Sequence, residues 1–203
     1  MSDKTELQIE LARLRAAGLG AKLAQQAAAN ELPTAFLFAI ASRETNCVNR
    51  LGDWHDGEAH GVGIVQIDIQ HDVARLARDD GSWRTNPDPL IALGSQLLAE
   101  NLRRARQAFP SAVLDEQLKI AASGYNCGMH AAIAGARDGD SDQCTTGRNY
   151  GADVMARMQG FEELMSSNQQ SAVSPCRAIS PPVAPDPHEA QTGFDAPNST
   201  VQV

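Results

Sequence analysis

Apolar residues recur at intervals of three and four positions through most of the chain, a spacing typical of α-helices that bury one face. The first such stretch predicts an amphipathic helix over residues 5–17, with Leu7, Leu11 and Leu14 on one side. Gly18-Leu19-Gly20 interrupts the pattern. A second helix, rich in Ala and Gln, is expected over residues 21–31.

A third helix is predicted to be buried on all sides. Pro33 lies where a helix can begin, and the run Thr34-Ala-Phe-Leu-Phe-Ala-Ile-Ala-Ser42 is almost wholly apolar. This helix reaches Glu44. Burial disfavours the ionised form of a carboxyl and raises its pKa, which would keep Glu44 protonated near neutral pH, as a general acid requires. The alternative is a surface glutamate paired with Arg43, since charged residues are mostly exposed.

The pattern changes between residues 49 and 68. Glycines punctuate a mostly polar run there, at Gly52, Gly57, Gly61 and Gly63. The apolar residues that follow predict a short strand or extended segment: Val62, Ile64, Val65 and Ile67. We expect a glycine-rich lobe that is too small to fold as an independent domain.

The rest of the chain returns to helical spacing. Five further helices are predicted, over residues 71–78, 90–105, 114–123, 129–136 and 149–165. Asn86-Pro-Asp-Pro89 marks the start of the clearest of them, and Pro110 marks its end. From residue 166 onward Ser, Gln, Asn and Pro dominate, and such a segment buries too little apolar surface to offset its ordering entropy. We therefore predict a folded domain over residues 1–165 and a disordered tail over residues 166–203.

Composition and charge exclude several classes of function. The chain has 203 residues, 42% of them hydrophobic, which is enough for a sizeable core. Its formal net charge of −8 argues against nucleic acid or an anionic membrane as a partner. No apolar run approaches the roughly 18 residues of a membrane span. The N-terminal MSDKTELQIE lacks the apolar segment of a secretory signal peptide, so no such signal is expected.

Cysteine and histidine positions do not predict a metal centre. The chain has four cysteines, Cys47, Cys127, Cys144 and Cys176, whose spacing matches no zinc site. Without a signal peptide, free thiols are the expected state; a Cys127–Cys144 disulfide is the alternative, because the two residues flank one predicted helix and loop. Three histidines lie near carboxylates in the sequence, His55, His60 and His71. Their spacing does not match that of a known metal-binding motif. No cofactor is expected.

Several short motifs, far apart in the chain, occur together. They are Ser42-Arg43-Glu44, Gly61-Val-Gly-Ile-Val-Gln-Ile-Asp68, Ala122-Ser-Gly-Tyr-Asn-Cys-Gly128 and Asn149-Tyr150-Gly-Ala-Asp-Val154. In this order they resemble motifs of the goose-type lysozymes and the related lytic transglycosylases, over residues 31–164. The resemblance implies a mainly α, lysozyme-like α+β fold, a helical bundle around a cleft with a small glycine-rich loop or hairpin. Cys127 replaces a usual Ala and Val65 a usual Met, modest apolar exchanges that should not prevent cleavage.

The resemblance also implies a reaction. It points to a peptidoglycan glycosidase that cleaves the β-1,4 bond between N-acetylmuramic acid and N-acetylglucosamine by inverting hydrolysis, with Glu44 as general acid. Carboxylates across the cleft, roughly 6.5–9.5 Å away, would hold the attacking water. Asp68 matches one of them; Asp53 fits the other best, with Asp56 still open. Read from the residues alone, Asp68 could instead cap a helix and Asp53 could form an Asx-turn.

Three further residues match family positions at the sugar-binding cleft: Tyr125, Asn126 and Tyr150. A tyrosine offers a pyranose ring an apolar face and a hydroxyl. The alternative for Tyr150 is a core tyrosine with a satisfied hydroxyl. Gln66 would contact an N-acetyl group or support the residues that do.

Two other functions stay open. A lytic transglycosylase would leave 1,6-anhydro sugars and would not need carboxylates that hold water. A non-catalytic module would bind peptidoglycan without cleaving it. In each case we expect action on the bacterial cell wall, periplasmic or extracellular, reached by non-Sec export, delivery or lysis. Peptidoglycan is the expected partner, and an inhibitor or immunity protein is a further one by analogy with delivered toxins.

Overall fold

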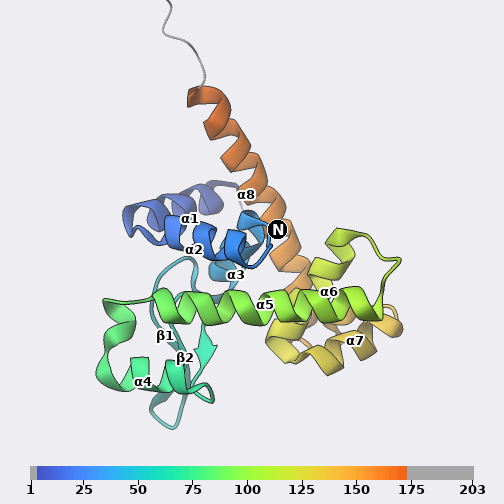
Figure 1. Cartoon of the computed structure of the whole chain (residues 1–203), viewed down its shortest axis with the longest axis horizontal. Helices are drawn as coiled ribbons and strands as arrows, with labels where there is room; N and C mark the ends of the chain where they lie inside the picture. The colour runs from blue at the N-terminus through green and yellow to red at the C-terminus, as the bar shows by residue number, and fades with distance from the viewer. Residues whose placement is uncertain (1–3, 173–203) are drawn as a thin grey trace, which may run out of the picture.

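The structure, a computed structural model, describes residues 4–172. This range contains eight α-helices, three 3-10 helices and one three-stranded antiparallel sheet, which confirms the predicted mainly α fold class (Figure 1). The α-helices are α1 (Lys4–Ala16), α2 (Leu19–Ala29), α3 (Thr34–Thr45), α4 (Asp72–Asp80), α5 (Asp88–Ala108), α6 (Leu114–Cys127), α7 (Met129–Arg137) and α8 (Tyr150–Ala172). The 3-10 helices are η1 (Ser82–Arg84), η2 (Ser141–Cys144) and η3 (Thr146–Arg148).

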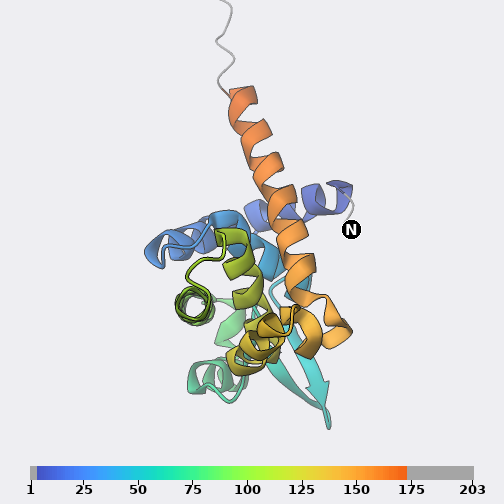
Figure 2. The same cartoon turned by 90° about the vertical axis from the view of Figure 1, so that its right-hand side faces the viewer.

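Each predicted helix is present, with shifts of a few residues at its ends. The largest extension is in α8, which continues past the predicted domain boundary at residue 165 and projects from the body of the molecule (Figures 1 and 2). Residues 173–203 of the predicted tail, and Cys176 with them, lie outside the described residues. Within residues 4–172, no helix has the length and apolar character needed to cross a membrane.

The core is organised around α3. Phe36, Leu37 and Ile40 are fully buried, so this helix is enclosed by its neighbours. Its main partner is α8, against which Phe38 and Phe161 pack edge to face with ring centroids 5.8 Å apart. Because α3 is fixed on all sides, the residues at its C-terminal end occupy defined positions.

The glycine-rich segment forms the sheet, with strands β1 (Leu51–His55), β2 (Glu58–Val62) and β3 (Ile67–Asp68) in that order. Asp56 and Gly57 connect β1 to β2, and both have positive φ, 52° and 83°. Such a pair suits the type I′ turn of a two-residue hairpin.

The prediction of an extended segment from Val62 to Ile67 is wrong for residues 63–66. Strand β2 ends at Val62, and a turn occupies residues 63–66 before β3 begins. Positive φ at Gly63 (84°) and Gln66 (49°) reverses the chain there. Ile64 and Val65 are fully buried, so their apolar character reflects a buried turn rather than a strand.

One predicted cysteine state also needs correction. Cys127 and Cys144 form a disulfide that joins the end of α6 to η2, whereas free thiols were expected. Helix α7 carries the chain out and back, so the two Cα atoms lie 5.8 Å apart, a normal separation for a disulfide. Cys47 is a free, buried thiol, and burial raises its pKa, which keeps the thiol protonated and unreactive.

Candidate active site

Glu44 lies at the end of α3, on a cleft of about 490 Å³. Asn46, with φ of 53°, and Cys47, with φ of 59°, turn the chain away after the helix and lead it towards the sheet. The cleft is lined by residues from α3, the sheet, α6 and η3: Glu44, Asp53, His60, Gly61, Gln66, Asp68, Tyr125, Asn126 and Thr146. Distant segments that carry the sequence motifs therefore meet at one concave surface.

The environment of Glu44 favours its protonated form. Burial is the main cause and raises the pKa of the carboxyl above its usual value, and the charge of Asp53 raises it further. The Tyr150 hydroxyl donates a hydrogen bond to Glu44 Oε1, and the Arg43 guanidinium lies 5.4 Å from the centre of the Tyr150 ring. The Tyr150 hydrogen bond and the Arg43 charge both lower the pKa and partly offset the burial.

Two further carboxylates share the cleft with Glu44. Asp53 is on β1, with its side chain 61% exposed and its Oδ1 3.0 Å from His55 Nε2. Asp68 is on β3, and its Oδ1 accepts a hydrogen bond of 2.7 Å from the backbone N–H of Gln70. Asp68 therefore makes a turn contact and also faces the cleft. Asp56, the open alternative to Asp53, is exposed in the hairpin turn and is not among the residues that line the cleft.

The Gln66 side chain lines the cleft and hydrogen-bonds to the backbone next to the sheet. Its Nε2 donates to the carbonyl oxygens of Gly63 (2.7 Å) and Arg50 (3.0 Å). A Cβ atom at Gly52 or at Gly61 would collide with Gln66 Oε1. Gly52 and Gly61 therefore have to be glycine, because the Gln66 side chain packs directly against their backbone.

Tyr125 and Asn126 line the cleft from α6. The Tyr125 hydroxyl donates to the carbonyl oxygen of Val65 (2.8 Å), and Asn126 Oδ1 accepts from the backbone N–H of Thr146 (2.9 Å). Tyr150 lies where the alternative interpretation placed it, in the core with its hydroxyl hydrogen-bonded. It is only 3% exposed and is not among the lining residues, because its hydroxyl is taken up by Glu44.

A buried polar network behind Glu44 was not predicted. Arg157 on α8 donates to Ser42 Oγ (2.6 Å) and to Asp153 Oδ2 (2.8 Å), and Ser42 donates to Glu10 on α1. Asp153 also lies 3.5 Å from Arg43 Nε. The network links α1, α3 and α8 and ends at Arg43, directly before Glu44.

The sequence does contain a signal for this network. Glu10 follows Leu7 by three positions and precedes Leu14 by four, so it falls on the apolar face of α1, and it is fully buried. A charged residue on such a face needs a buried partner. The partner could not be named from the sequence, because Arg157 is brought to it only by the packing of α8.

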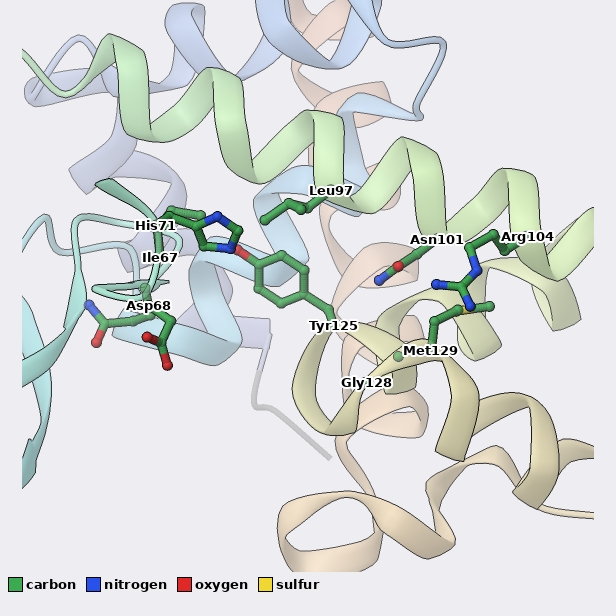
Figure 3. Close-up of a pocket in the computed structure, with 11 residues that line it drawn as sticks. Ile67, Asp68, His71, Leu97, Asn101, Arg104, Tyr125, Gly128 and Met129 are labelled. Carbon is green, nitrogen blue, oxygen red and sulfur yellow. The ribbon is translucent and has the colours of Figure 1, made fainter. Parts of the chain in front are cut away.

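The cleft continues into a second pocket of about 290 Å³ (Figure 3). Gln66, Asp68 and Tyr125 line both spaces, so the two are contiguous. Figure 3 places Asp68 at one end of this pocket, Tyr125 in the middle, and Asn101 and Arg104 of α5 at the other end. A long ligand that contacts Glu44 could therefore extend towards α5.

Comparison with known proteins agrees with this arrangement. The family described as Lysozyme g matches residues 19–164, which include every cleft-lining residue. A lysozyme g of Gallus gallus is 29% identical over 129 residues, covering 64% of this chain and 56% of the relative. A lysozyme g of Casuarius casuarius is 28% identical over 129 residues, an alignment that covers 64% of this chain and 64% of the relative.

A lysozyme g of Epinephelus coioides is 30% identical over 138 residues, covering 63% of this chain and 66% of the relative. The alignments thus span less than two thirds of each of these relatives. The family match itself takes in more than half of this chain and contains the motifs on which the resemblance was based. The chain belongs to the lysozyme g family.

Proposed function

We propose that the protein is a peptidoglycan glycosidase that hydrolyses the β-1,4 bond between N-acetylmuramic acid and N-acetylglucosamine. The observation that carries the proposal is the pairing of a partly buried Glu44, whose pKa is raised, with Asp53 and Asp68 in one cleft. A protonated carboxyl opposite ionised carboxylates is the arrangement that an inverting glycosidase needs. Membership of the lysozyme g family supports the same reaction.

In the proposed reaction Glu44 transfers its proton to the glycosidic oxygen as the bond to the anomeric carbon breaks. The carboxylate that remains is stabilised by the Tyr150 hydroxyl and by the nearby charge of Arg43. A water held by Asp68 and Asp53 attacks the anomeric carbon from the other face and loses its proton to a carboxylate. The products are a new reducing end with inverted configuration and a free hydroxyl on the leaving sugar.

Product analysis separates hydrolysis from lytic transglycosylation. An internal attack on the muramic acid would leave 1,6-anhydro ends and would have no use for the two aspartates. We expect digestion of purified peptidoglycan to give reducing ends when muropeptides are analysed by mass spectrometry. If all new ends were anhydro sugars, the role proposed for Asp68 and Asp53 would be wrong.

Asp68→Asn is expected to lower the rate of reducing-end formation by about 10²–10⁴-fold, because the amide is too weak a base to hold and deprotonate water. Release of reducing sugars from purified peptidoglycan measures this. Asp56→Asn is a matched control on the same sheet, since Asn-Gly suits the type I′ turn as well as Asp-Gly and residue 56 lies outside the cleft. If both variants lost activity to a similar extent, the cause would be a less stable hairpin and not the loss of a base at Asp68.

Tyr150→Phe is expected to extend the reaction to higher pH. The Tyr150 hydrogen bond lowers the pKa of Glu44, so its removal raises that pKa further and keeps the acid protonated as the pH increases. The same change should lower the maximal rate, because the Glu44 carboxylate loses a stabilising donor. A pH profile of kcat tests both effects; an alkaline limb that stays in place or moves to lower pH would contradict this role.

The proposed substrate implies action at the bacterial cell wall, in the periplasm or outside the cell. An inhibitor or immunity protein, if the enzyme is delivered as a toxin, would have to cover the cleft that contains Glu44. Such a protein would protect cell walls from the wild-type enzyme and would compete with peptidoglycan for binding, which a turbidity assay with the candidate partner can measure.

A further inference from the structure

Arg104 stands out among the charged residues near the cleft. It lines the far end of the second pocket, beside Asn101, and is exposed (Figure 3). Its neighbour Arg103 makes two hydrogen bonds to Glu100, of 2.6 and 2.7 Å. Within residues 4–172, by contrast, no hydrogen bond or close ion pair holds the Arg104 guanidinium, although its charge acts on Glu100 one turn earlier. A cation is therefore available at the end of a pocket that begins at the catalytic cleft.

We propose that Arg104, with Asn101 beside it, forms a subsite for a carboxylate of the peptide that muramic acid carries. The inference rests on the proposed function, since it assumes a peptidoglycan strand in the cleft. Muramic acid bears a lactyl group from which a peptide extends sideways, and this peptide has free carboxylates. The guanidinium presents a planar set of donors that matches a carboxylate with two parallel hydrogen bonds.

Position and charge both support this assignment. The pocket shares Gln66, Asp68 and Tyr125 with the cleft, so a side branch of a sugar bound beside Glu44 has a continuous path towards α5. The chain as a whole has a net charge of −8, which opposes the approach of an anionic polymer. The exposed Arg104 cation at one end of the binding surface offsets this repulsion locally and selects strands that carry peptides.

The test compares Arg104→Gln with wild type on two substrates, intact peptidoglycan and glycan strands freed of peptide by an amidase. We expect kcat/KM on intact peptidoglycan to fall about tenfold, mainly through KM, and to be unchanged on the peptide-free strands. The defect should shrink at high salt, because an exposed charge is screened. Arg106→Gln is the matched control, since Arg106 is exposed on the same helix and does not line the pocket; it should change the rate on neither substrate by more than about twofold.

Three outcomes would overturn the subsite. An unchanged rate on intact peptidoglycan would exclude it. An equal loss on both substrates would assign Arg104 to the glycan, since the peptide-free strands still carry the lactyl carboxylate. An equal loss in Arg106→Gln would indicate general electrostatic attraction.

Binding gives a second measurement that does not depend on turnover. In a Glu44→Gln background, Arg104→Gln should weaken binding to intact peptidoglycan sacculi by the same factor and leave binding to peptide-free strands unaltered. Equal binding with and without Arg104 would exclude the subsite even if cleavage proved undetectable. A wild-type protein that cleaves neither substrate would instead overturn the proposed function, so the two failures can be told apart.

Discussion

Glu44→Gln is expected to lower the rate of peptidoglycan cleavage by about 10²–10⁴-fold, because an amide cannot donate the proton that the leaving oxygen needs. The substitution keeps the shape of the side chain. The amide can still accept the hydrogen bond from the Tyr150 hydroxyl, so the cleft should be preserved. Loss of turbidity and release of muropeptides measure the effect. Retained binding to cell walls with cleavage lost would also separate an enzyme from a non-catalytic binding module.

The same variant should not be less stable at neutral pH. The pKa of Glu44 is raised in the folded protein, so its carboxyl favours folding below the unfolded-state pKa and loses that contribution as the pH rises through the folded-state value. The substituted amide would be neutral at every pH, and the melting temperature at pH 7 should be equal or higher. Glu162→Gln, an exposed change on α8, serves as the matched control for activity. Wild-type cleavage by the Glu44→Gln protein would exclude Glu44 as the acid.

Arg157→Ala is expected to lower the free energy of unfolding by about 3–5 kcal/mol, because it leaves the fully buried Glu10 without its cation. The Arg157 side chain is 11% exposed, and Glu10, whose Oε1 lies 3.8 Å away, is fully buried. Asp153, which accepts 2.8 Å from Arg157 Nε, also loses its closest cation. Urea unfolding followed by circular dichroism measures the change, with the exposed Arg15→Ala on α1 as a control expected within about 0.5 kcal/mol of wild type.

A double variant tests the reason for this loss. Replacing Glu10 and Arg157 together with Met should recover part of the stability, because no charge from this pair is then left buried alone. If the double variant were as unstable as the sum of the Glu10→Met and Arg157→Met single changes, packing rather than charge pairing would explain the effect. Activity is a second measurement, since the network ends at Arg43 beside Glu44.

Local sequence accounts for the helices well. Their apolar spacing repeats over several turns, and Pro and Gly mark many of the ends, so neighbouring residues suffice to predict them. The hairpin was harder to predict from local sequence, although Asp56-Gly57 is a strong type I′ turn signal. The polar residues around it do not alternate with apolar ones. The segment from Val62 to Ile67 was wrongly predicted to be extended throughout. A buried turn and a buried strand are equally apolar, so composition alone does not distinguish them.

Glu44 could be named from the buried helix that it ends, but the other candidate site residues could be named only because the motifs resemble those of a known family. Asp53 and Asp56 both lie in the glycine-rich sequence, where Asp53 matched the family position best and Asp56 stayed open. Pairing of β1 with β2 places Asp53 on the cleft and Asp56 in the turn, which favours Asp53 as the candidate. Tyr150 was expected along the sugar path, but the packing of α8 on α3 directs its hydroxyl to Glu44.

By itself, the sequence determined the helical architecture, the exclusion of a basic nucleic-acid surface, and the identity of Glu44 and Asp68 as candidate catalytic groups. These features depend on spacing, composition and short motifs, which survive without knowledge of distant contacts. Only the tertiary structure determined the environment of Glu44, the buried network from Glu10 to Arg43, the Cys127–Cys144 disulfide and the pocket that ends at Arg104. Each of these joins segments far apart in the chain, and their proximity is a property of packing.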